Sequence, residues 1–329
     1  MGRKRKVEDQ WLPPRVYRGK SAFEFRPADG GCIRLCPLSA SQRAVWRRYE
    51  EEMSTVEIRS GSFAHLAKDF LESKAFKDLS PRTRKDYLRY SEKVIPVFGK
   101  MSANGIKPVH IRQYMDKRGE QTEVQANREH SFMSKVFSWG YERGRVSVNP
   151  CLKVRKFTEE SRTRYITDDE YLAVLNVARP LIRAAMEISY CCAARQGDVL
   201  NLTRDQLLEE GIFIKQGKTS KAQIKRWSDR LRSAIDTALS FQKVKNLKYV
   251  MAVETGEHLT GHKLRQWYRE AKRDAEKNNP HLSFDFTFHD IKAKAISDYE
   301  GDKQKFSGHK TAAQVAVYDR KVEVSDTHN

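Results

Sequence analysis

The sequence contains few cysteines and no long run of hydrophobic residues. Five cysteines among 329 residues are sparse and odd in number, which excludes a disulfide-stabilised scaffold and favours reduced thiols in a cytosolic compartment. No apolar run approaches the roughly 18 residues that a membrane span requires. The basic residues 1–6 are not followed by the apolar stretch of a secretory signal. We therefore exclude an integral membrane protein and expect no membrane partner.

The common cofactor and metal motifs are also missing. The chain has no Gly-x-x-x-x-Gly-Lys-Ser/Thr phosphate loop, no glycine fingerprint of a dinucleotide site and no His-Glu-x-x-His. Cys32 and Cys36 have no second Cys or His pair nearby, as a zinc site would require. No cluster of carboxylates indicates a two-metal nuclease site. We predict a function that needs no cofactor and no metal.

The chain is strongly basic. Lys and Arg number 62 against 43 Asp and Glu, which gives a net charge of +19. Basic residues exceed acidic ones in every third of the chain, most strongly between residues 61 and 162, with 21 basic and 12 acidic side chains. This distribution favours an extended surface for the phosphates of a nucleic acid. A soluble protein with an ordinary basic surface is the alternative.

The N-terminal part, residues 1–55, is predicted to be a small β domain. Short strands are expected at 21–26 and 32–36, and Asp29-Gly30-Gly31 between them has the composition of a hairpin turn. A helix is expected at 39–53. This part is too small to bury a large core by itself, so we expect it to bind or dock against something.

Residues 60–150 are predicted to be helical. Ser80-Pro81 combines a capping residue with a first-turn proline, and helices are expected at 81–98, 108–119 and 123–142. Basic residues lie between the apolar ones, which is compatible with a clamp on DNA. A plain helical bundle with a solvated face shows the same pattern.

A polar, basic linker is predicted at 151–163, followed by a second folded region at 164–329. Thr167 and Glu170 have the spacing of a capping box. The remaining pattern predicts helices at 168–177, 180–192, 197–207, 229–242, 261–278, 288–299 and 311–319, with strands at 211–215 and 222–228.

The second region contains four short segments with chemically active side chains. In the first, Arg195 and Asp198 have the spacing of one helical face, where the carboxylate could hold the guanidinium toward a phosphate. The second places Lys218 on a turn between the two expected strands. Each segment is also compatible with an ordinary surface role, as an exposed ion pair or a solvated lysine.

The other two segments lie near the C-terminus. His289 and Lys292 are three residues apart, and Ser307-Gly-His309 is followed by Tyr318. On one straight helix His309 and Tyr318 would lie about 13 Å apart on opposite faces. If both act on one phosphate, the chain must break between them. Taken alone, these residues could equally be surface or packing residues.

The order of these residues resembles the catalytic domain of the tyrosine recombinases. The upstream motifs are similar to the helical core-binding domain of that family; they are Ser80-Pro-Arg-Thr83, Tyr87, Ala126-Asn127-Arg128, Phe137-Ser-Trp139, Gly144 and Asn149-Pro150. Leu12-Pro13-Pro14-x-x-Tyr17 resembles the start of the arm-binding domain of lambda-type phage integrases. The resemblance therefore covers nearly the whole chain.

The resemblance implies a mainly α, multidomain fold. Residues 1–55 would form a three-stranded arm-type DNA-binding domain, and residues 60–150 a helical, SAM-like core-binding domain. After the linker at 151–163, residues 164–329 would form a mixed α+β catalytic domain.

The resemblance also implies a reaction. Tyr318 would attack a DNA phosphodiester, form a 3′-phosphotyrosyl bond and release a 5′-hydroxyl. Arg195, Lys292 and His309 would hold the non-bridging oxygens, and Lys218 would protonate the leaving oxygen. His289 would be an accessory hydrogen-bonding or proton-transfer group, and Asp198 would support Arg195.

Two departures from the family pattern stand within these motifs. The second arginine of the family is Lys292 here, which keeps the charge but loses the bidentate fork. The usual Leu-Gly-His is Ser307-Gly-His309, which changes packing more than chemistry.

The partners implied are double-stranded DNA, at the core and arm sites of phage and host attachment regions, and further copies of the chain in a tetramer on DNA. A DNA-bending host factor and an excisionase are implied as accessory proteins, and the bacterial cytoplasm and nucleoid as the location. The alternatives are a non-catalytic DNA-binding remnant of the same fold and an activity like that of a type IB topoisomerase.

Overall fold

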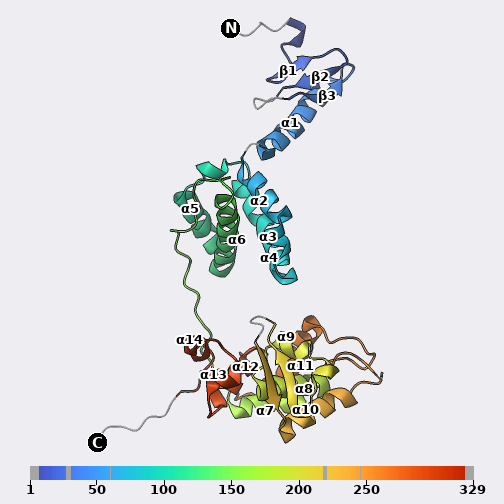
Figure 1. Ribbon diagram of the computed structural model, residues 1–329, viewed down its shortest axis with the longest axis vertical. Coiled ribbons are helices and arrows are strands. Elements are labelled where there is room, and N and C mark those ends of the chain that lie inside the picture. Colours follow the sequence, from blue (N-terminus) through green and yellow to red (C-terminus); the bar gives the residue numbers. More distant parts are fainter. Residues whose placement is uncertain (1–6, 27–30, 60, 218–220, 245, 323–329) are drawn as a thin grey trace, which may run out of the picture. The chain divides into compact units, whose positions relative to one another are not determined.

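The computed structural model describes residues 7–26, 31–59, 61–217, 221–244 and 246–322 (Figure 1). The chain forms two compact units, residues 1–160 and 161–329. Among the described residues, the first unit contains two separate hydrophobic clusters, and the second unit contains a large cluster and a small one. In the described ranges, no helix combines the length and apolar character needed to cross a bilayer.

The first unit begins with a three-stranded antiparallel sheet in the order β1-β2-β3 (Figure 1). The strands are β1 (Val16–Arg18), β2 (Ala22–Phe25) and β3 (Ile33–Pro37), followed by α1 (Gln42–Arg59). Alternating side chains of β2, Phe23 and Phe25, are buried with Leu35 of β3 and Val45 of α1. The expected hairpin of β2 and β3 is confirmed; Asp29 and Gly30 of its turn lie outside the described residues.

The rest of this unit is helical, as the sequence predicts. Its helices are α2 (Phe63–Glu72), α3 (Lys74–Lys77), α4 (Pro81–Phe98), η2 (Ala103–Gly105), α5 (Pro108–Gly119) and α6 (Glu123–Tyr141). The Ser80 hydroxyl accepts the backbone N–H of Thr83, which confirms the predicted cap. Helix α6 is central, since it packs against α2, α4 and α5 and contributes buried Phe132 and Phe137.

The segment predicted as a linker is divided between the two units. In the first unit, Asn127 holds its first half: the Asn127 side chain accepts the Phe157 N–H at 2.9 Å and donates to the Phe157 carbonyl at 2.9 Å. Residues from Ser161 onward belong to the second unit.

The second unit has α8 (Pro180–Cys192) at its centre. This helix packs against α7 (Asp168–Val177), α10 (Asp229–Ser240), α11 (Gly261–Asn278) and α12 (Asp290–Asp298). It is buried along most of its length, as at Ile182 and Met186. Strands β4 (Gly211–Lys215) and β5 (Ala222–Arg226) form an antiparallel pair. The capping box of Thr167 and Glu170 is confirmed.

The prediction of one helix over residues 197–207 is wrong. Helix α9 spans only Gln196–Leu200, and the 3-10 turn η3 (Arg204–Gln206) follows. The carbonyl of Leu202 accepts the N–H of Val250 at 2.9 Å. The backbone after α9 therefore pairs with a segment distant in sequence instead of continuing the helix.

The C-terminal helices are shorter than expected. Helix α14 (Ala312–Ala316) is shorter than the helix predicted at 311–319, and α13 (Lys303–Ser307) was not predicted. Gly308 ends α13 in the left-handed conformation, with φ of +68°, and Thr311 caps α14. The chain therefore breaks between His309 and Tyr318, as the geometric argument requires.

Candidate active site

Arg195 is placed by a sharp change of direction after α8. Ala193 ends α8 in the left-handed conformation, with φ of 47°, and Arg195 is the extended N-cap residue of α9. The Arg195 guanidinium donates to the Gln216 side-chain oxygen at 2.7 Å. The Gln216 amide in turn donates to the Ser307 carbonyl at 2.9 Å. Gln216 thus links Arg195 to the segment that carries His309, a role that the sequence analysis missed.

Asp198 has a different partner from the one expected. Its carboxylate accepts the Gly217 N–H at 3.0 Å, and its other oxygen has no hydrogen-bond partner among the described residues, so it does not bind Arg195. Because Arg195 is the N-cap residue of α9 rather than part of the helix, the two side chains do not share a helical face. Asp198 therefore fixes the chain directly after β4.

Lys218 lies outside the described residues, so its predicted role as general acid stays a prediction. The strands on either side of it are paired in register, with Lys215 opposite Ala222.

Lys292 is fully buried on α12. Its side chain is 1% exposed, and its ammonium donates to the Ala193 carbonyl at 2.6 Å. The same nitrogen lies 5.8 Å from the centre of the Tyr318 ring. Burial, and next the positive charge of Arg195, lower the pKa of Lys292 to about 7, although Asp198 acts in the opposite direction.

His309 is also buried, at 3% exposure. Its backbone N–H donates to the Ser307 hydroxyl at 3.4 Å, whereas neither ring nitrogen has a hydrogen-bond partner among the described residues. Burial, and next the charges of Lys292 and Arg195, lower the pKa of His309 to about 4. A neutral imidazole with two unused nitrogens is therefore available to a bound group.

Tyr318 lies directly against these groups. Its ring stacks on His309 with centres 4.8 Å apart and planes at 25°. Its hydroxyl is 3.4 Å from Nε2 of His289, the residue that precedes α12. Burial lowers the pKa of His289. The Asp290 carboxylate acts to raise this pKa, and the nearby cations Lys292 and Arg195 lower it further. The structure thus brings His289, Lys292 and His309 together around Tyr318.

The site has an excess of positive charge. Lys225 on β5 is drawn into it: its ammonium donates to the Phe306 carbonyl, and burial lowers its pKa. Arg195 is close enough to lower the pKa of Lys292, His289 and His309. Preorganised donors of this kind in a buried setting suit a group that carries negative charge. No local pattern distinguishes Lys225 from any other strand lysine, so its place in the site could not be predicted.

Comparison with known proteins agrees with this architecture. The profile described as "Phage integrase central domain" matches residues 63–157, and the one described as "Phage integrase family" matches residues 164–323. The integrase of Escherichia phage HK022 is 23% identical over 350 residues, covering 97% of this chain and 96% of the relative. The integrase of Escherichia phage lambda is 22% identical over 366 residues, with the same coverage.

Solved structures show the same fold. A lambda integrase dimer bound to a COC′ core site covers 99% of both chains, with a TM-score of 0.67 and 18% identity. Residues 75–356 of lambda integrase, also as a dimer on a COC′ core site, give a TM-score of 0.70 at 18% identity, covering 81% of this chain and 99% of the other. The predicted multidomain, mainly α fold is confirmed. The chain belongs to the phage integrase family: it is a site-specific tyrosine recombinase, an enzyme that cuts and rejoins DNA.

Proposed function

We propose that Tyr318 is the nucleophile and that Arg195, Lys218, His289, Lys292 and His309 form its active site. The observation that carries this assignment is the position of the Tyr318 ring, stacked on His309 and close to both His289 and the Lys292 ammonium. None of the three neighbours is adjacent to Tyr318 in sequence, so the fold alone brings them together.

The proposed reaction conserves the phosphodiester bond energy. The Tyr318 oxygen attacks phosphorus, so a P–O(Tyr) bond forms while the bond to the 5′ oxygen breaks. His289, within hydrogen-bonding distance of the Tyr318 hydroxyl, accepts its proton, and Lys218 protonates the leaving 5′ oxygen. The 5′-hydroxyl of another strand then attacks the 3′-phosphotyrosyl bond and releases Tyr318.

The remaining groups would stabilise the charge on the phosphate. Arg195 and Lys292 would donate to the non-bridging oxygens, and His309 would donate through one of its unused ring nitrogens. Donors fixed in advance at such positions each contribute about 3–4 kcal/mol to catalysis. Asp198 and Gln216 would act indirectly, because they hold in place the segments that carry the donors.

The proposed substrates are attachment sites of phage and host DNA. Lambda integrase has been solved as a dimer on a core site and as a tetramer on a Holliday junction. By analogy, residues 60–150 and 164–329 would each bind a core site, residues 1–55 would bind separate arm sites, and four chains would exchange strands. The proposal includes a DNA-bending host factor and an excisionase as accessory proteins, and the bacterial cytoplasm and nucleoid as the location.

The deciding experiment uses a nicked suicide substrate that traps the covalent adduct. Tyr318→Phe should bind this DNA normally and form no adduct, because only the hydroxyl is lost. Tyr299→Phe is the matched control, since Tyr299 is an exposed tyrosine of the same unit whose ring packing on Phe306 a phenylalanine keeps. Adduct formation by Tyr318→Phe would contradict the assignment.

The same adduct assay tests the first alternative, and a relaxation assay on supercoiled DNA tests the second. A non-catalytic remnant would form no adduct even as the unmodified chain. A topoisomerase-like enzyme would relax supercoiled DNA without preference for an attachment site.

A further inference from the structure

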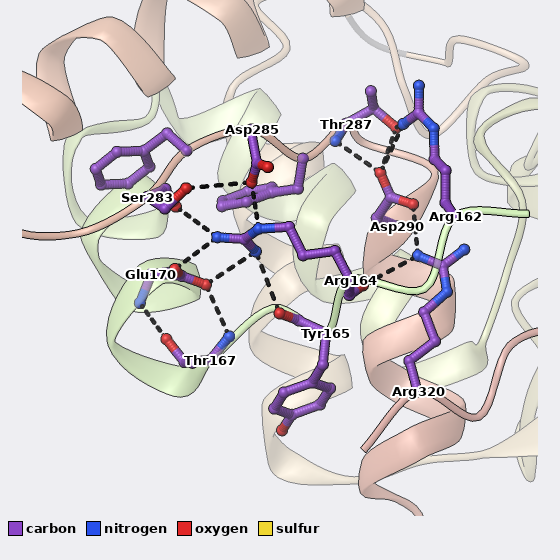
Figure 2. Close-up of polar contacts among 12 residues, drawn as sticks. Arg162, Arg164, Tyr165, Thr167, Glu170, Ser283, Asp285, Thr287, Asp290 and Arg320 are labelled. Carbon is purple, nitrogen blue, oxygen red and sulfur yellow. Dashed lines mark hydrogen bonds and ion pairs between the residues drawn. The ribbon is translucent and has the colours of Figure 1, made fainter. Parts of the chain in front are cut away.

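A second cluster lies beside the active site and is centred on Asp290 (Figure 2). The Asp290 side chain is 4% exposed, and both of its oxygens are used. One accepts from the Arg320 guanidinium at 2.7 Å. The other accepts from the Arg162 guanidinium at 3.0 Å and from the N–H and hydroxyl of Thr287, each at 2.8 Å. Asp290 follows His289 directly and is the first residue of α12.

The Arg320 partner belongs to the segment that carries Tyr318. Arg320 is two residues beyond Tyr318, and its side chain is 7% exposed. Its backbone N–H donates to the Ser297 hydroxyl at 2.7 Å, and this hydroxyl donates to the Tyr318 carbonyl at 3.1 Å. The stretch from Tyr318 to Arg320 is therefore fixed to α12 at both Ser297 and Asp290.

Asp290 also reaches the segment that enters this unit from the linker. Arg162 binds it directly, and Arg320 donates to the Arg164 carbonyl at 3.2 Å. The Arg164 side chain is held in turn by Glu170, Asp285 and the Ser283 carbonyl (Figure 2). The buried Asp290 carboxylate thus joins the linker end and the segment after Tyr318 to the start of α12.

The charge balance shows that this contact is formed by ions. Burial alone would raise the pKa of Asp290, but the hydrogen bonds from Arg320 and Thr287 hold that pKa at about 2. Asp290 is therefore ionised at every physiological pH. Removal of Arg320 would leave a buried carboxylate with one exposed arginine as its remaining cation, a state that is strongly disfavoured.

We propose that Arg320 and Asp290 are positioning residues that dock Tyr318 in the active site of its own chain, and that Arg162 connects this dock to the linker. The proposal rests on the proposed role of Tyr318 as nucleophile. Loss of the contact frees the Tyr318 segment and leaves Arg195, Lys292 and His309 in place.

Docking has a distinctive kinetic signature. Cleavage starts from free Tyr318, so its rate is proportional to the fraction of chains in which the segment is docked. Religation starts from the phosphotyrosyl adduct, in which the covalent bond already holds Tyr318 at the phosphate. A docking residue therefore affects cleavage and leaves religation almost unchanged, whereas a group that stabilises the transition state affects both.

The test measures single-turnover cleavage of a suicide substrate, and religation of the isolated adduct, for Arg320→Ala and Arg320→Lys. We expect Arg320→Ala to slow cleavage at least 10-fold and religation less than 2-fold, with unchanged DNA affinity. Arg320→Lys keeps the charge and should recover part of the cleavage rate. Arg179→Ala is the matched control, because it removes an arginine from the exposed ion pair with Glu270 elsewhere in this unit and should change neither rate.

Arg162→Ala tests the connection to the linker without risk to folding, since the Arg162 side chain is 61% exposed. Its cleavage should fall about 2- to 5-fold with religation unchanged. If Arg320→Ala does not fold, Arg320→Lys and Arg162→Ala test the proposal instead, through the loss of the cleavage rate relative to the loss of the religation rate.

Cleavage at the normal rate in the Arg320 variants, or equal losses of cleavage and religation, would overturn the docking proposal. Those outcomes leave the proposed function intact as long as Tyr318→Phe forms no adduct. An adduct in Tyr318→Phe would instead remove the nucleophile assignment itself.

Discussion

Lys292 should give DNA cleavage a pH dependence that an arginine at the same position would not. Its side chain is buried, and its pKa is about 7 instead of the usual 10.5. At 1.36 kcal/mol per pKa unit, this difference means that the buried site disfavours the charged ammonium by about 5 kcal/mol relative to an ordinary lysine. At pH 8 only about a tenth of the free chains would carry this charge. A phosphate in the site favours the charged form, so DNA binding above pH 7 should take up a proton.

The assay is single-turnover cleavage at saturating DNA between pH 6 and pH 10. The unmodified chain should lose rate at alkaline pH, by up to about tenfold per unit, above an apparent pKa that lies between that of the free site and that of an ordinary lysine. Lys292→Arg should lack this alkaline loss, because arginine stays charged. Lys292→Ala should cleave about 10²–10³-fold more slowly, the usual effect of deleting one transition-state donor, and should also lack the loss.

DNA affinity should change little in both variants, because many other phosphate contacts contribute to it. Arginine is larger than lysine and this position is buried, so overpacking alone could slow cleavage by Lys292→Arg. In that case, the pH dependence of Lys292→Ala decides whether Lys292 is the titrating group. An alkaline loss that persists in Lys292→Ala would assign the titration to another group. Equal rates for Lys292→Ala and the unmodified chain would remove Lys292 from the active site.

Three further predictions concern other parts of the chain. Lys218→Ala should slow cleavage of ordinary DNA strongly, and a substrate with sulfur at the bridging 5′ position should restore most of the rate, since a thiolate leaves without protonation; equal losses on both substrates would make Lys218 a phosphate-binding or structural residue. Deletion of residues 1–55 should preserve core-site cleavage and abolish binding to separate arm sites, as gel-shift assays would show; complete integration by the truncated chain would refute the arm-binding role. His309 has a pKa of about 4 in the folded chain against about 6.5 when unfolded, so the unfolded state binds the extra proton first as pH falls. Its contribution to stability is therefore present above pH 6.5 and falls by about 2 kcal/mol between pH 7 and pH 5; urea unfolding should show a smaller loss over that interval in His309→Asn.

Local signals were sufficient wherever a helix begins at its own capping residues. Ser80 before α4 and Thr167 before α7 are recognisable in the sequence because each cap bonds to a residue three positions ahead. The end of α9 could not be found in the same way. Directly after α9, the Leu202 carbonyl pairs with Val250, and no local pattern contains that information.

The active site shows the same division. His309 and Tyr318 could be selected because the order of motifs resembles a known family, and the break between them followed from helix geometry. Gln216 could not be selected, since its importance arises from bonds to Arg195 and to the Ser307 carbonyl, which are far from it in sequence. The partner of Asp198 was misjudged because Arg195 precedes α9 instead of lying within it.

The shortness of α14 has a consequence for how Tyr318, the proposed nucleophile, reaches the active site. A helix of five residues is not stable by itself in water, and Val315 is its only residue buried in the described structure. Detaching this segment would therefore unfold it, so secondary structure and attachment form together in one step. Hydrogen exchange at the Val315 and Tyr318 amides would report the fraction of chains in which this segment is folded and attached, without any DNA being cut.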